Sequence, residues 1–189
     1  MQDGESRLQK RVFLLTGAPG VGKTTVLAKT VDNLKAKGVS VGGMVSREAR
    51  EGGVRVGFEI LDLTSGRHGW LAHINQRTGP QVGKYRVNIE DLESIGAEAI
   101  MGAVEKCAVV AIDEIGPMEL FSIRFKQAVK QALKSKKTVL AVVHAKARDP
   151  LIAEAKQRED AETFIVTFDN RNMLAEELTQ KAERNLKTT

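Results

Sequence analysis

A nine-residue segment near the start of the chain, GAPGVGKTT at residues 17–25, restricts the possible folds more than any other part of the sequence. It follows the apolar run at 12–15 and precedes a helical pattern of apolar residues. A strand, a glycine-rich loop and a helix in this order are the context in which Gly-x-x-x-x-Gly-Lys-[Ser/Thr] indicates a phosphate-binding loop. The sequence therefore predicts that a nucleotide is bound by Gly17, Ala18, Pro19, Gly20, Val21, Gly22, Lys23, Thr24 and Thr25.

The residue types of this loop suit a phosphate chain. Glycine lets the backbone approach a ligand closely, and successive N–H groups at the start of a helix form a nest for phosphate oxygens. Lys23 would reach the β- and γ-phosphates and serve catalysis, and the Thr24 hydroxyl would ligate Mg²⁺. The alternative is a glycine-rich turn that matches the pattern by chance, and the flanking strand and helix argue against it.

An acidic motif follows a strand pattern later in the chain. Val109–Ile112 is a continuous apolar run, typical of a strand buried on both faces, and Asp113 and Glu114 come directly after it. Asp113 is expected to hold Mg²⁺ directly or through water. Glu114 points to a different place and could orient and polarise a water in line with the γ-phosphate. Alone, this pair could merely end a strand in solvent; with the loop at 17–25 it predicts a Mg²⁺-assisted catalytic site.

Strand patterns alternate with helical patterns along most of the chain, which predicts an α/β fold with a mostly parallel sheet and helices on both faces. A glutamate directly after this aspartate characterises the additional-strand P-loop proteins, including the RecA-like ATPases. In these an extra strand separates the two motif strands, and the analogy favours hydrolysis. The patterns predict strands over 12–15, 39–49, 84–87, 108–112, 138–143 and 164–168, and helices over 23–37, 88–106, 121–133, from Pro150 and from Arg171.

Residues from about 40 to 87 depart from this alternation. Val54, Val56, Phe58 and Ile60 recur at every second position, which indicates a half-buried strand. Turn signals precede and follow this stretch, and the segment around 70–72 can pair back as a further strand. We therefore predict an antiparallel β-meander at about residues 40–87, with a polar loop over 75–83.

Several other polar residues are candidates for the site. Cations near the transferred phosphoryl group stabilise its transition state, so an arginine or lysine could act as an internal arginine finger or contact the edge of the base. His144 follows a buried strand pattern, where either a γ-phosphate sensor or a capping histidine can lie. The alternative for each cation is a solvated surface charge. The cationic candidates are Arg47, Arg50, Arg55, Lys84 and Arg171.

The overall composition limits the range of partners and locations. The 189 residues suit a single domain over 1–189 with a flexible lead-in at about 1–10, and no apolar run approaches the length of a membrane helix. One cysteine, Cys107, excludes an internal disulfide and fits a reducing, cytoplasmic location. The net charge of +5 is spread over helix faces, so we expect no nucleic-acid partner and no membrane association.

Five segments of the sequence resemble, in order, the nucleoside-triphosphatase family first described from thermophiles, whose vertebrate members are called cancer-related nucleoside triphosphatases. The segments at 46–60 and 114–120 make the resemblance specific. It covers nearly the whole chain. The matching segments are GAPGVGKTT at 17–25, SREAREGGVRVGFEI at 46–60, VGKYRV at 82–87, VVAIDEIGPMEL at 109–120 and FDNRN at 168–172.

This resemblance implies a RecA-like fold and slow, Mg²⁺-dependent hydrolysis of several nucleoside triphosphates to diphosphates. It places Gly17–Thr24 on the family's nucleotide-binding loop and Asp113 and Glu114 on its Walker-B pair. Pro117 stands where some members carry lysine, so we expect no catalytic role there. The family's remaining motif positions fall on Glu48, Arg50, Arg55, Lys84 and Arg171.

Three functions are compatible with the sequence. The first is a Mg²⁺-dependent phosphohydrolase that turns a nucleoside triphosphate, including ATP and GTP, into a diphosphate and phosphate. The second is a kinase that passes the γ-phosphate to a nucleotide or small acceptor, although no acceptor motif is recognisable. The third is a nucleotide-dependent switch whose output is the binding of a partner protein or a nucleic acid. Base preference is expected to be broad, because the phosphate loop contacts no base and no guanine-reading Asn-Lys-x-Asp motif is present.

Overall fold

One continuous sheet runs through the computed structural model, which describes residues 9–187. The strand order in this part of the chain is β5-β6-β4-β3-β2-β7-β8-β1-β9. Most of the predicted lead-in at 1–10 lies outside the described residues. The strands are β1 (Val12–Thr16), β2 (Val41–Glu51), β3 (Val54–Asp62), β4 (His68–His73), β5 (Gln81–Val82), β6 (Tyr85–Val87), β7 (Val109–Ile115), β8 (Thr138–Val143) and β9 (Ala161–Ile165).

The half of the sheet that carries the two sequence motifs is parallel. β2 pairs with β7, β7 with β8, β8 with β1 and β1 with β9, all in parallel. β8 therefore separates β1, which leads into the phosphate loop, from β7, which carries Asp113 and Glu114. This is the arrangement that the Asp-Glu pair predicted, and the RecA-like α/β fold is confirmed.

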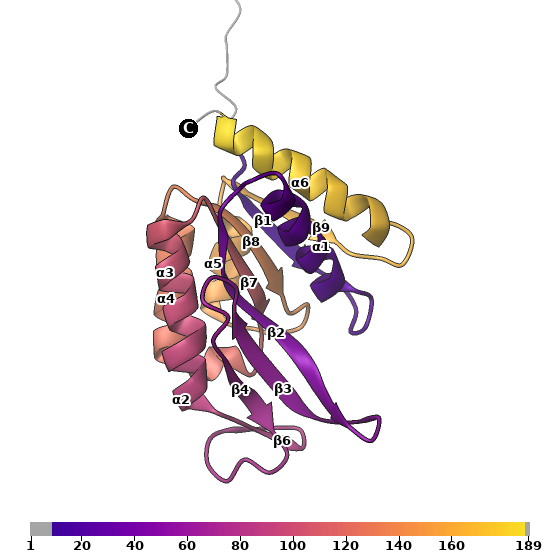
Figure 1. Ribbon diagram of the computed structural model, residues 1–189, viewed down its shortest axis with the longest axis vertical. Coiled ribbons are helices and arrows are strands. Elements are labelled where there is room, and N and C mark those ends of the chain that lie inside the picture. Colours follow the sequence, from indigo (N-terminus) through magenta and orange to yellow (C-terminus); the bar gives the residue numbers. More distant parts are fainter. Residues whose placement is uncertain (1–8, 188–189) are drawn as a thin grey trace, which may run out of the picture.

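Helices cover both faces of this parallel half (Figure 1). α1 and α6 pack on one face with the side chains of Phe13 and Leu15, whereas η1, α3, α4 and α5 pack on the other with Val12 and Leu14. No helix in the described part of the chain is long and apolar enough to cross a membrane. The helices are α1 (Lys23–Ala36), α2 (Ile89–Asp91), η1 (Leu92–Ala97), α3 (Glu98–Lys106), η2 (Glu119–Phe121), α4 (Ile123–Lys134), α5 (Pro150–Gln157) and α6 (Arg171–Lys187).

The other half of the sheet is the predicted antiparallel meander. Met44 is the last β2 residue that pairs with β7, and β2 then continues to Glu51 as one arm of a hairpin with β3. β3, β4, β6 and β5 follow in antiparallel pairs, and Figure 1 shows the β2–β3 hairpin projecting from the core. One face of this extension, with Ile60 and Leu71, packs against Leu92 of η1 within the main core.

The last strand lies earlier in the chain than the apolar pattern predicted. The prediction placed it over 164–168, whereas β9 ends at Ile165. The parallel pairing with β1, from Val12 with Ala161 to Thr16 with Ile165, fixes this register. β1 ends at Thr16, so the parallel pairing stops there. The Val166 N–H makes one further hydrogen bond, to the Thr16 carbonyl oxygen, and Phe168 is left in the connection to α6.

Three further local expectations differ from the structure. Phe121 was expected on the buried face of a helix, but Ser122 caps α4 by accepting a hydrogen bond from the Phe125 N–H, so Phe121 falls in η2 and is exposed. The segment 88–106 is helical but contains the π-helical turn η1 between α2 and α3. The polar loop expected over 75–83 includes the short strand β5, which pairs with β6.

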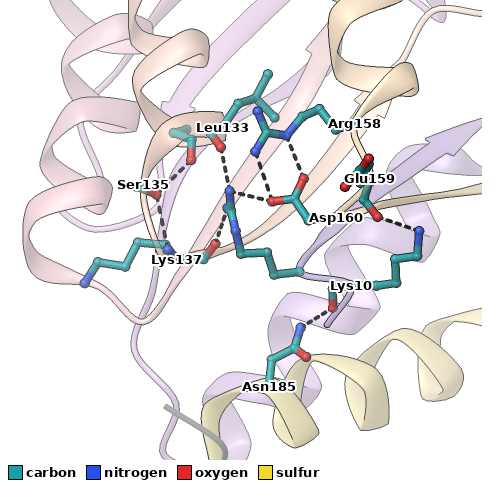
Figure 2. A network of polar contacts seen from close by, with 10 residues as sticks. Lys10, Leu133, Ser135, Lys137, Arg158, Glu159, Asp160 and Asn185 are labelled. Atoms are coloured by element: carbon teal, nitrogen blue, oxygen red, sulfur yellow. Dashed lines mark hydrogen bonds and ion pairs between the residues drawn. The ribbon is translucent and has the colours of Figure 1, made fainter. Parts of the chain in front are cut away.

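A polar network ties together the amino ends of the parallel strands, at the edge away from the phosphate loop. The Arg11 guanidinium, just before β1, donates to the carbonyl oxygen of Leu133 at 2.7 Å and pairs with Asp160 at 2.7 Å. Figure 2 shows Arg158 donating to the same carboxylate. A cavity of about 320 Å³ lies beside this network, with Lys137 in its wall. These contacts connect the residue before β1 to the end of α4 and to the residue before β9.

Candidate active site

The phosphate loop leaves β1 after Thr16 and enters α1 at Lys23, as the sequence predicted. Gly22 precedes the helix with φ at 104°, a conformation that favours glycine, and no side chain caps the first turn. No acidic residue stands in that turn either. The N–H groups at the start of α1 are therefore available to an anion. Ala18, Pro19 and Gly20 are exposed, so the loop is open to a ligand.

Gly17 is fixed against the connection between β9 and α6. A Cβ atom added at Gly17 would lie 2.6 Å from the carbonyl oxygen of Val166, which is closer than such atoms approach. The Val166 N–H in turn donates to the Thr16 carbonyl oxygen at 2.7 Å. The loop can therefore hold its position only because residue 17 has no side chain.

Lys23 folds back over the loop that precedes it. Its ammonium group donates to the carbonyl oxygens of Gly17 at 3.3 Å and Ala18 at 3.2 Å. The positive charge therefore lies over the loop that would hold a phosphate chain. Thr24 and Thr25 are the next residues of α1, and both are exposed.

Asp113 is buried on β7 and faces Thr24. Its side chain is 2% exposed, and one of its carboxylate oxygens, Oδ2, has no hydrogen-bond partner. Burial raises the pKa of Asp113 to about 7, and a hydrogen bond with Thr24 acts in the opposite direction. A buried carboxylate oxygen without a partner, beside a threonine hydroxyl, fits the oxygen ligands that Mg²⁺ prefers. The described residues hold no group of three His, Cys, Asp or Glu suited to a metal, so phosphate and water oxygens would complete the coordination.

Glu114 lies next to Asp113 but has different neighbours. The pairing of β7 with β8 shifts between Ile112 and Ile115, so both acidic residues fall within an irregular step of the strand. Such irregularities re-aim side chains and are frequent beside active sites. Glu114 is half-buried, and its Oε1 would lie 2.6 Å from a Cβ added at Gly116. Glycine at 116 therefore leaves the space that this carboxylate uses.

A third carboxylate, which the sequence reasoning missed, lies on the same turn. Glu119 is 4% exposed, and its Oε2 would lie 3.2 Å from the same Cβ added at Gly116. Burial, together with the charges of Glu114 and Asp113, raises the pKa of Glu119 to about 8, against hydrogen bonds from the backbone N–H groups of Glu119 and Gly116. The sequence signal that could have identified Glu119 is its position as the one acidic residue within the otherwise apolar run 117–121.

Glu119 makes stability depend on pH in a defined direction. Its folded-state pKa of about 8 exceeds the unfolded value of 4.5, so the stability it contributes is fully present below pH 4.5 and is lost as pH rises through 8. Glu119→Gln stays neutral, so we expect this variant to gain about 1 kcal/mol or more of unfolding free energy relative to wild type between pH 5 and 8.5. Urea unfolding at both pH values measures the difference. Glu90→Gln, at an exposed site on α2, is the control, and parallel pH profiles for Glu119→Gln and wild type would contradict the prediction.

His144 and Arg171 both lie close to these groups. His144 follows β8, between the two motif strands; its backbone N–H donates to the Ile115 carbonyl oxygen at 3.1 Å, and its Nδ1 accepts from the Lys146 N–H at 3.3 Å. Arg171 is the first residue of α6, and its Cδ would lie 3.4 Å from a Cβ added at Gly22. The structure therefore places one sensor candidate and one cation beside the predicted site.

The other cationic candidates are held within the antiparallel extension. Arg50 and Arg55 both pair with Glu48, at 2.7 and 2.6 Å, and these hydrogen bonds lower the pKa of Glu48. Arg55 also donates to the Tyr85 hydroxyl at 2.9 Å, and the Lys84 ammonium lies 5.4 Å from the centre of the Tyr85 ring. Their described contacts are thus with the meander, whereas Arg171 contacts the phosphate loop. Arg47 likewise pairs with Glu59 of β3.

Known proteins resemble this chain over nearly its whole length. A family model described as NTPase matches residues 12–179. A nucleoside-triphosphatase THEP1 from Thermofilum pendens is 49% identical over 170 residues, which are 89% of this chain and 93% of that protein. A nucleoside-triphosphatase THEP1 from Methanosarcina acetivorans is 47% identical, over 91% of this chain and 97% of that protein.

Two solved structures share the fold. The crystal structure of THEP1 from the hyperthermophile Aquifex aeolicus matches with a TM-score of 0.81 and 30% identity, over 92% of this chain and 99% of that one. The solution structure of a human cancer-related nucleoside triphosphatase matches with a TM-score of 0.78 and 36% identity, over 93% and 98% of the two chains. The similarity therefore includes both the parallel core and the antiparallel extension.

Proposed function

The chain belongs to the NTPase family, and on this basis we propose that it is a Mg²⁺-dependent phosphohydrolase that converts nucleoside triphosphates and water into diphosphates and phosphate. The observation that carries the proposal is the placement of Asp113 and Glu114. Asp113 faces Thr24 at the end of the phosphate loop, and Glu114 follows it on the same irregular step of β7. An aspartate that can hold the metal and a glutamate that can orient water are groups that support hydrolysis at this loop.

Binding rests on the loop and its helix. The N–H groups at the start of α1 and the Lys23 ammonium would hold the β- and γ-phosphates, with the nitrogen atom of Lys23 exchanging loop carbonyls for phosphate oxygens. Thr24 and Asp113 would hold Mg²⁺, which neutralises charge on the phosphates when bound. Arg171 is the cation best placed to join them, because its side chain lies against Gly22.

Glu114 would position the attacking water and accept its proton. The water oxygen forms a bond to the γ-phosphorus while the bond from that phosphorus to the bridging oxygen breaks. The diphosphate leaves with its charge stabilised by Lys23 and the loop N–H groups, and the proton passes from Glu114 to the released phosphate. Positioning and electrostatics supply the rate enhancement, since phosphoryl transfer needs little covalent chemistry from the protein.

We expect a panel of ATP, GTP, CTP and UTP to release phosphate with kcat/KM values within about tenfold of one another, or roughly 1.4 kcal/mol. The physical reason is that the predicted contacts are with phosphates, which all four share. Chelation of Mg²⁺ should abolish phosphate release. A parallel assay with γ-labelled ATP and small-molecule acceptors tests whether the γ-phosphate is transferred to an acceptor other than water. Label in a new organic phosphate above the level of free phosphate would favour a kinase, and activity with a single base would contradict broad specificity.

The location of the protein stays a prediction. Cys107, the single cysteine of the sequence, is buried and unpaired, which supports the expected reducing, cytoplasmic environment. We likewise propose that residues 1–189 act as one domain, because the sheet joins elements from β1 to β9.

A further inference from the structure

Exposed apolar side chains are concentrated beside the phosphate loop. Eight large apolar residues are exposed in the described part of the chain, and three of them lie within the segment 165–173. Ile165 and Phe168 are each 67% exposed and Met173 is 76% exposed. Single exposed apolar residues need no explanation, but several in one short segment indicate a binding surface.

This segment forms one wall of the loop. The Val166 carbonyl oxygen packs against Gly17 at the start of the loop, and Arg171 packs against Gly22 at its end. A nucleoside is attached to the phosphate chain, so it must leave the loop along a neighbouring surface. The segment 165–173 is such a surface, because Val166 contacts the start of the loop and Arg171 contacts its end.

Hydrogen bonds hold this connection in one conformation. The Asn170 side chain accepts from the Thr167 N–H at 2.9 Å and donates to the Ile165 carbonyl oxygen at 2.8 Å. The Asn170 N–H donates back to the Thr167 hydroxyl at 3.2 Å. Phe168 lies inside this closed turn, so its backbone is held in place before any ligand binds and little backbone ordering entropy remains to be lost.

Arg171 links the Phe168 ring to the phosphate loop. Its guanidinium carbon lies 5.3 Å from the centre of the ring, within the range of a cation–π contact. Its Nη1 would lie 3.6 Å from a Cβ added at Gly22. An exposed aromatic surface, a cation and a phosphate-binding loop are thus adjacent, which matches the order of base and phosphates in a nucleotide.

We propose that the base of the bound nucleotide stacks on the Phe168 ring, which Arg171 supports from its side facing the loop. This inference rests on the proposed function in one respect, that the phosphates occupy the loop at 17–25. Every base has a π-face, so a phenyl ring binds purines and pyrimidines alike. Phe168 therefore makes the protein bind nucleotides more tightly than inorganic phosphates without selecting among the bases.

The test compares ligands that share phosphates but differ in the base. Calorimetric titration with the Mg²⁺ complexes of ADP, UDP and inorganic pyrophosphate needs no hydrolysis, so it is independent of the reaction. Phe168→Ala should weaken ADP and UDP about tenfold and leave pyrophosphate unchanged. Phe168→Tyr keeps the aromatic face and should bind all three as wild type does.

Phe121→Ala is the matched control. Phe121 is 49% exposed in η2, after β7, which is three strand spacings from β9, or about 14 Å. It should change none of the three affinities. Unchanged ADP and UDP affinity in Phe168→Ala, or an equal loss for pyrophosphate, overturns the stacking proposal alone. If the wild type binds none of the three ligands, both the stacking proposal and the proposed function are overturned. If the wild type binds nucleotides but does not hydrolyse them, only the proposed function is overturned.

Discussion

Glu114→Gln is expected to lower phosphate release by about 100-fold or more while leaving nucleotide affinity within about threefold of wild type. Glutamine has nearly the same shape and can still contact the water, but it cannot accept the proton that the water loses. The phosphate loop, Lys23 and Asp113 are untouched, so binding should persist. Phosphate release under saturating ATP and calorimetric titration with Mg²⁺-ADP measure the two quantities separately.

The control for this variant is Glu90→Gln, which removes an exposed carboxylate on α2 and should retain full activity. The phosphate-release rate of Glu119→Gln is an informative comparison, because this substitution alters the buried carboxylate next to Glu114 on the turn after β7. A Glu114→Gln protein that releases phosphate at the wild-type rate would exclude Glu114 as the general base. A variant that loses affinity in parallel with turnover would instead assign Glu114 to ligand binding.

Asp113→Asn should change activity and stability in opposite directions. The carboxylate is almost fully buried, and its Oδ2 lacks a hydrogen-bond partner, so the ionised group is costly in the metal-free protein. Asparagine removes that charge, and its side-chain carbonyl oxygen can still accept a hydrogen bond from the Thr24 hydroxyl. We expect phosphate release to fall about 100-fold or more, because a neutral amide binds Mg²⁺ weakly, and the metal-free protein to become more stable.

The gain in stability should depend on pH. The folded-state pKa of Asp113, about 7, lies above its unfolded value of 3.8, so its contribution is lost as pH rises through 7. The advantage of Asp113→Asn should therefore be small at pH 4 and reach about 1 kcal/mol or more at pH 8.5. Urea unfolding without metal at the two pH values measures it. A variant less stable than wild type at pH 8.5 would contradict the prediction.

Adding Mg²⁺ and ADP distinguishes a metal-binding role of Asp113 from a purely structural one. Mg²⁺ with ADP should raise the melting temperature of the wild type, because a ligand that binds only the folded state stabilises it by mass action. The same addition should raise that of Asp113→Asn much less. Asp32→Asn, at the exposed side of α1, serves as the control and should respond as wild type does. Equal increases in melting temperature for all three proteins would show that Asp113 does not bind the metal.

Local rules were sufficient for the phosphate loop and for most helices. Gly17 and Gly22 need backbone freedom that other residues lack, and the apolar spacing of Leu27, Val31 and Leu34 specifies the buried face of α1. These features depend on residues within a few positions of one another. The same holds for Asn88, whose side chain caps α2, and for Pro150 at the start of α5. The presence of an extra strand between the two motif strands was predicted by analogy from the Asp-Glu pair and was confirmed, because β8 lies between β1 and β7.

The errors arise where two elements compete for the same residues. The apolar spacing over 161–168 is compatible with more than one strand register, and only the pairing with β1 ends β9 at Ile165. Phe121 fits a helical face by spacing, but the Ser122 cap begins α4 two residues later. The first error placed Phe168 in a strand and the second placed Phe121 on a helical face. Both side chains are exposed, and Phe168 lies in the connection beside the phosphate loop.

The sequence by itself determined which residue types stand at the candidate site, a phosphate-loop motif with Lys23 and Thr24 and an Asp-Glu pair after a buried strand, and it predicted a metal-binding role for Asp113 and a water-positioning role for Glu114. It did so because loop conformation and residue type are local properties. Only the tertiary structure decided which charges are buried and which cations are near. Glu119 and Asp113 have raised pKa values because elements distant in sequence exclude water from them. Arg171 rather than Arg50 or Arg55 contacts the loop because parallel pairing of β9 with β1 carries the start of α6 to Gly22.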